Sequence, residues 1–153
     1  MTLRNFKYIF QQVFFDDVPG FFISVPGAAD TETFALAERV VEDALRSAFN
    51  SAGQRCSALR VLFLQQEIAD SVIELLQGAM AELVIGDPAD ITTDVGPVID
   101  EVAYDKLVLH AAKLEAKGHL IYQTPLPDYF SPGYFVSPSL FEIVSFVDFL
   151  FEL

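Results

Sequence analysis

The chain has a single cysteine, no tryptophan and few basic residues, and each shortage narrows what it can be. One cysteine cannot form an internal disulfide, and a free thiol favours a reducing compartment. The chain does not open on a basic segment, an apolar run and a small-residue cleavage site, so we expect a cytoplasmic protein. Every apolar run is shorter than the roughly 18 to 20 residues of a membrane span, which predicts no membrane partner.

The shortage of basic residues excludes a second class of partner. Nine Lys and Arg stand against 22 Asp and Glu, which gives a net charge of −13. Nucleic-acid binding depends on basic side chains that neutralise phosphates, so we expect no nucleic-acid partner. None of the eight glycines forms the G-x-G-x-x-G pattern of a dinucleotide site. The acidic surplus is typical of a solvated surface.

The apolar pattern predicts helices that alternate with short strands. With 153 residues the chain has the size of one domain. Apolar residues at helical spacing predict helices over residues 30–52, 68–83 and 102–118. Short apolar runs predict strands at 58–64 and 119–123. This alternation favours an α/β fold, with helices packed on a short, mostly parallel sheet.

Both ends differ in composition from the middle. Of 15 Phe residues, seven lie in residues 1–34 and six in residues 130–153. Four prolines interrupt the segment from Thr124 to Phe141, which predicts a surface crossover or edge strands rather than a helix. We therefore expect the two flanks to differ from the middle in origin or in packing.

The only cysteine, Cys56, lies in the stretch "SAGQRCSALRVLFLQ". A cysteine becomes nucleophilic where backbone N–H groups or a cation favour its thiolate. Gly53 allows a tight turn before it, and Arg55 adds a positive charge next to it. Free cysteines are also among the most buried residues and usually only pack. Residue types and spacing alone leave both roles open.

The wording of this stretch resembles the catalytic-cysteine segment of the aldehyde dehydrogenase superfamily. The resemblance is closest to the glutamate semialdehyde (1-pyrroline-5-carboxylate) dehydrogenase module of bifunctional proline utilization A proteins. Further family segments occur in the same order and extend the resemblance over residues 34–143; they are "FALAERVVEDALRSAF", "IADSVIELLQGAMAELVIGDP", "DVGPVID" and "YFVSPSLFEI".

The resemblance implies NAD-dependent oxidation of L-glutamate γ-semialdehyde to glutamate, a reaction of proline catabolism. Cys56 would attack the small-molecule aldehyde to form a thiohemiacetal, and its own backbone N–H would help to hold the oxyanion. Hydride would pass to NAD, and water would hydrolyse the thioester. Ser57 matches the family position that binds the substrate carboxylate, although its hydroxyl could equally cap its own turn. Gln54 and Arg55 would shape the turn.

Other parts of the family pattern are missing. The family's Glu-(Leu/Thr)-Gly-Gly segment should lie where the chain reads "VPGFFISVPGAAD", and its Glu-x-Phe-Gly-Pro segment where the chain reads "FEIVSFVDFLFEL". We therefore expect a truncated catalytic-domain fragment without its own cofactor domain, in which NAD binding is doubtful. The expected division is a divergent Phe-rich flank at 1–33, the family fragment at 34–143 and a divergent tail at 144–153.

Three functions remain open on the sequence. The chain could be a working dehydrogenase subunit that takes its base and cofactor from another chain. It could be a non-catalytic remnant or interaction module that self-associates through exposed apolar surface. It could also be a reactive-thiol protein without oxidoreductase activity. We expect no metal site, because no second cysteine or carboxylate joins His110 and His119 at ligand spacing.

Overall fold

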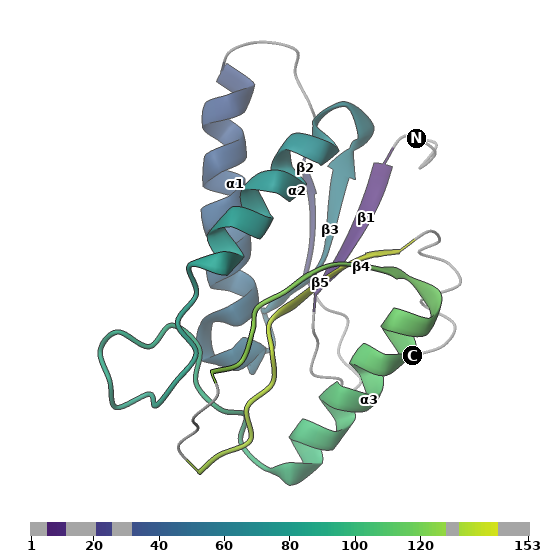
Figure 1. The fold of residues 1–153 in the computed structure, drawn as a ribbon. Coiled ribbons are helices and arrows are strands. Elements are labelled where there is room, and N and C mark those ends of the chain that lie inside the picture. The colour runs from purple at the N-terminus through teal and green to yellow at the C-terminus, as the bar shows by residue number, and fades with distance from the viewer. Residues whose placement is uncertain (1–5, 12–20, 26–31, 128–131, 144–153) are drawn as a thin grey trace.

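The computed structural model describes residues 6–11, 21–25, 32–127 and 132–143 (Figure 1). Its elements, in chain order, are β1 (Phe6–Gln11), β2 (Phe21–Val25), α1 (Glu32–Phe49), the 3₁₀ helix η2 (Asn50–Gly53), β3 (Leu59–Gln65), α2 (Gln66–Ala81), α3 (Glu101–Lys117), β4 (His119–Gln123) and β5 (Ser139–Ile143). The predicted α/β class is confirmed. No helix in these ranges is long and apolar enough to span a bilayer.

The helices form where apolar residues recur at helical spacing. In α1 the residues Ala37, Val41, Ala44 and Ala48 are buried, and in α2 the residues Ala69, Val72, Leu76 and Met80 are buried. The helix expected over 30–52 is present as α1 followed by η2, and its first two expected residues lie outside the described residues. The expected strand at 119–123 is present as β4.

The expectation of a mostly parallel sheet is wrong. The strand order is β2-β3-β1-β5-β4, and only β2 and β3 run parallel, while the other three pairings are antiparallel. Alternating helices and strands predict parallel neighbours only when successive strands pair. Here β1 lies between β3 and β5 and separates β3 from β4, the next strand along the chain.

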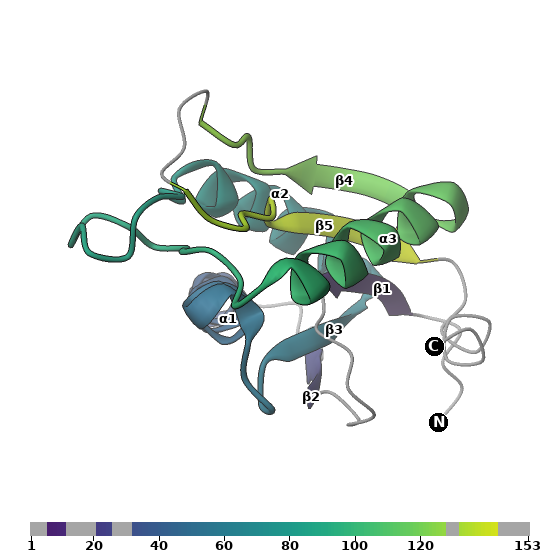
Figure 2. The same ribbon diagram turned by 90° about the horizontal axis from the view of Figure 1, so that it is seen from below.

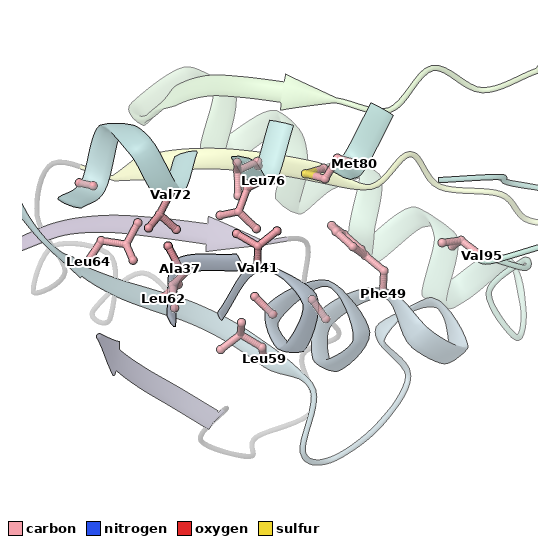
Figure 3. Close-up of a cluster of buried hydrophobic side chains, with 14 of the residues drawn as sticks. Ala37, Val41, Phe49, Leu59, Leu62, Leu64, Val72, Leu76, Met80 and Val95 are labelled. Atoms are coloured by element: carbon pink, nitrogen blue, oxygen red, sulfur yellow. The ribbon is translucent and has the colours of Figure 1, made fainter. Parts of the chain in front are cut away.

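Helices cover both faces of this sheet. Leu62 and Leu64 of β3 belong to a large buried cluster with side chains of α1 and α2. Figure 3 shows both leucines pointing toward that cluster, which includes Val72. Val61, from the opposite face of β3, packs instead with Leu114 of α3. Figure 1 shows α3 lying apart from α1 and α2. The result is a three-layer arrangement.

Two connections complete the described fold. The loop between α2 and α3 projects from the body in both views, and Ile91 on it is fully exposed (Figures 1 and 2). The proline-interrupted segment leads into β5, which begins directly after Pro138. Because β5 lies between β1 and β4, the edge-strand alternative is wrong for the residues of that segment that form β5.

Candidate active site

The turn that carries Cys56 begins on an unusual stretch of backbone. After α1, the φ angles of Ser51, Ala52 and Gly53 are 58°, 53° and 73°. Only glycine adopts this left-handed region freely, and each other residue held there costs about 1–3 kcal/mol. Strained backbone of this kind concentrates at active sites, where surrounding contacts maintain it. The stretch reverses the chain between α1 and β3.

Cys56 and Ser57 occupy the centre of the next turn. The N–H of Ala58 donates to the carbonyl of Arg55 at 3.1 Å, which closes a β-turn around the two residues. This bond leaves the N–H groups of Cys56 and Ser57 outside the turn's own hydrogen bonding. The Cys56 thiol is free and exposed, and Ser57 is exposed beside it. A thiol in this position is open to a reagent or substrate and does not contribute to a core.

Two side chains fasten the turn to the end of α1. The guanidinium Nη2 of Arg55 donates to the carbonyls of Arg46 at 2.8 Å and Ser47 at 3.1 Å. Carbonyls in the last turn of a helix lack partners within the helix, so this contact caps α1. The N–H of Leu59 also donates to Ser47 Oγ at 3.1 Å. The positively charged Arg55 side chain therefore interacts with the C-terminal end of α1.

A different cation, Arg60, interacts electrostatically with Cys56. Arg60, the second residue of β3, is only 8% exposed. Burial lowers the pKa of the Arg60 guanidinium from its ordinary value, and the negative charge of Cys56 partly offsets that shift. Our sequence analysis did not single out Arg60. The signal was a lone charged residue inside the apolar run "ALRVLFL".

Gln54 connects the Cys56 turn to a distant loop. Its Nε2 donates to the carbonyl of Ser51 at 3.1 Å and more weakly to that of Pro97 at 3.5 Å. Its Oε1 accepts the N–H of Ile99 at 2.9 Å. The side-chain amide thus contacts both the left-handed stretch and the loop before α3.

The two histidines lie away from this turn. His119 is exposed at the start of β4, and His110 is half-buried on α3. The described ranges contain no group of three His, Cys, Asp or Glu side chains that could hold a metal ion.

Two cavities among the described residues do not fit NAD. The cavity behind the turn is lined by apolar side chains, including Phe49, Ala52, Val98 and Leu107. A second cavity, next to Arg60, is otherwise lined by apolar residues of α1, β3, α2 and β5. A pyrophosphate needs a row of backbone N–H groups at a glycine-rich turn or helix start, and neither cavity offers one. We therefore assign no NAD-binding residue.

Comparison with known proteins identifies the class. The family model described as "Aldehyde dehydrogenase family" matches residues 31–151, and the chain belongs to this family. Members of the family use NAD as the oxidant for aldehydes.

Particular relatives define the branch. The chain is 48% identical over 120 residues to "Bifunctional protein PutA" of Klebsiella aerogenes, a match that covers 75% of this chain and 9% of that protein. It is 33% identical over 104 residues to "1-pyrroline-5-carboxylate dehydrogenase" of a Geobacillus species, covering 68% of this chain and 20% of that protein. A crystal structure of proline utilization A from Bradyrhizobium japonicum matches with a TM-score of 0.67 and 44% identity, over 78% of this chain and 11% of that one. The chain spans about a tenth of the length of the PutA proteins it matches.

Proposed function

We propose that this chain supplies the nucleophile for the oxidation of L-glutamate γ-semialdehyde to glutamate, with Cys56 as the catalytic residue. The exposure of the Cys56 thiol on a fastened turn, which directly follows a strained stretch of backbone, carries the proposal. Family membership and the similarity to 1-pyrroline-5-carboxylate dehydrogenases support the substrate.

The step assigned to this chain is addition of sulfur to the aldehyde. The Cys56 thiolate forms a bond to the carbonyl carbon, the C=O π bond opens, and the oxyanion takes a proton to give a thiohemiacetal. The N–H of Cys56, which takes no part in the turn's own hydrogen bond, stabilises the oxyanion as it develops. Ser57, next to the nucleophile, donates its hydroxyl to the substrate carboxylate. The later oxidation needs NAD, to which we assign no residue of this chain.

Protection of Cys56 from alkylation tests this proposal. The purified chain is labelled with iodoacetamide, and because Cys56 is the only cysteine the label reports one site. Glutamate semialdehyde should slow labelling saturably, and the Ser57→Ala variant should need about tenfold more of it, since a hydrogen bond to a charged group is worth about 1.5–3 kcal/mol. An aldehyde of equal length without the carboxylate is the matched control. Unchanged labelling at every semialdehyde concentration would refute the proposal.

Exposed apolar residues favour a second function, as an interaction module that binds another copy of itself. Ile99 is 80% exposed, Val102 61% and Leu109 60%, and all three lie on α3 or just before it. The net charge of −13 opposes association, so salt should increase the dimer fraction by screening. Sedimentation velocity on the same samples would show a monomer at all salt concentrations if this second function is wrong.

A further inference from the structure

We propose that Gln54 is a positioning residue that fastens the Cys56 turn to the Pro97–Ile99 loop and so keeps the Cys56 N–H aimed at the oxyanion. The inference rests on the proposed role of Cys56 as nucleophile. In this inference the Gln54 side chain, two residues before Cys56, holds the Cys56 N–H in position.

The Gln54 amide makes contacts in both directions. Nε2 faces the carbonyls of Ser51 and Pro97, and Oε1 faces the N–H of Ile99. Two acceptors on one side and a donor on the other fix which end of the amide is nitrogen. The side chain is half-buried; its bonds to Ser51 and Ile99 are exposed, and only the weaker bond to Pro97 is partly shielded from water. An amide on a side chain of this length is required, because both a donor and an acceptor must reach from the turn to the Pro97–Ile99 loop.

The loop that Gln54 contacts is itself anchored. The N–H of Val98 donates to the carbonyl of Tyr134 at 2.8 Å, and the Val98 side chain is only 5% exposed. Val98 also packs with Ala103 and Leu107 of α3. Gln54 therefore joins the turn to a fixed part of the structure, which restrains the turn more than a free loop would.

Gln54 also contacts the strained backbone that precedes the Cys56 turn. Ser51 and Ala52 adopt left-handed conformations that cost free energy and persist only when surrounding contacts hold them. Arg55 and Ser47 hold the turn on the α1 side. Gln54 holds it on the opposite side, through Ser51 and the loop. Without Gln54 the turn is fastened on one side only, and the peptide that bears the Cys56 N–H can rotate.

Two reactions of Cys56 separate positioning from a general structural role. With p-nitrophenyl acetate, sulfur attacks the acetyl carbon through a tetrahedral oxyanion, the ester C–O bond breaks, and p-nitrophenolate leaves a thioester on Cys56. With iodoacetamide, sulfur displaces iodide directly and no oxyanion forms. A misaimed N–H slows only the first reaction, because only that transition state uses it.

The experiment compares the two rates in the wild type, in Gln54→Met and in Gln54→Ala. Methionine keeps the size of the side chain and removes its hydrogen bonds. Gln77→Ala is the matched control, because Gln77 Nε2 donates to the carbonyl of Ile121 at 3.2 Å, an equivalent amide bond far from the turn. We expect acylation to fall about tenfold or more in Gln54→Met, since misplacement by 1 Å can cost about 100-fold. Alkylation should stay within about twofold, and Gln77→Ala should change neither rate.

The outcomes distinguish this inference from the proposed function. If wild-type Cys56 acylates no faster than N-acetylcysteine, the nucleophile proposal fails and the inference fails with it. If the wild type is fast and Gln54→Met matches it, only the inference is overturned. Equal losses in both reactions would also overturn it, because Gln54 would then serve folding alone. Hydrogen exchange at the Ile99 N–H supplies an independent measurement, and it should quicken in Gln54→Met and not in Gln77→Ala.

Discussion

The two faces of the sheet pack against their helices in different ways. On the side of α1 and α2, one large cluster buries side chains from both helices and from β3. On the side of α3 the described residues form two small clusters, one against the sheet and one against the loop before the helix. The Cys56 turn connects α1 to β3, so it is supported by the better-packed side.

Hydrogen bonds hold both ends of α3. Asp100 caps the start of α3, where its Oδ1 accepts the N–H of Ala103 at 2.8 Å. At the other end the N–H of Gly118 donates to the carbonyl of Leu114 at 2.6 Å. A side chain at Gly118 would place its Cβ 2.9 Å from the Glu142 carbonyl, so only glycine fits where α3 meets β5. The comparison therefore predicts different sensitivities on the two sides.

The largest effect is expected in the cluster under α1 and α2. Leu64 is fully buried there, while Leu109 on α3 is 60% exposed. Leu64→Ala should lower the free energy of unfolding by about 2–5 kcal/mol, because it removes buried surface and leaves a cavity. Leu109→Ala, the same chemical change, should stay within about 0.5 kcal/mol. Urea unfolding measures both, and similar losses would contradict the contrast between the two sides.

The sequence predicted the helices better than the sheet. Helix positions follow from local apolar spacing, so α1, α2 and α3 lie close to where that spacing placed them. Strand pairing is a long-range property that local spacing does not contain, and β1 from the N-terminal flank joins the middle of the sheet. Even in α3 apolar spacing does not define the buried face alone, because Val102 and Leu109 are exposed while Ala103 and Leu107 are buried.

The next largest effect is the dependence of stability on pH that His110 on α3 causes. Burial, with a smaller contribution from the charge of Lys113, lowers the pKa of His110 from 6.5 to about 4. Between these values the unfolded chain binds a proton that the folded chain does not, so stability falls as pH falls from 6.5 to 4. The slope reaches about 1.4 kcal/mol per pH unit.

Two histidine variants isolate this slope. His110→Gln cannot take up the proton and should flatten the pH dependence of the free energy of unfolding over that interval. His119→Gln is the control, because the His119 side chain is exposed at the start of β4. Urea titrations across the pH interval measure both variants, and a slope that survives in His110→Gln would assign it to carboxylates instead.

The candidate site was predictable in part. The position of Cys56 and Ser57 in a turn after a helix and before a strand followed from Gly53 and the apolar run behind it. The contacts of the neighbouring side chains did not follow, because their partners lie outside the turn. Gln54 bonds to Ile99, 45 residues away, and Arg55 turns back to α1. Local sequence contains no information on either partner.

The smallest predicted effect tests whether a hydrogen bond or a charge starts α3. Asp100→Ala removes the acceptor for the Ala103 N–H and should cost about 1 kcal/mol in urea unfolding. Asp100→Asn keeps an oxygen acceptor and removes the charge, so it should cost only a few tenths of a kcal/mol. Equal losses in both variants would mean that the carboxylate charge, through the helix dipole, matters more than the hydrogen bond.

Because Asp100 directly follows the Pro97–Ile99 loop, a fraying helix start would also loosen the loop that Gln54 contacts. Asp100→Ala should therefore slow acylation of Cys56 slightly, by less than Gln54→Met does. A smaller loss of rate in Asp100→Ala would connect the start of α3 to the candidate site through the Pro97–Ile99 loop.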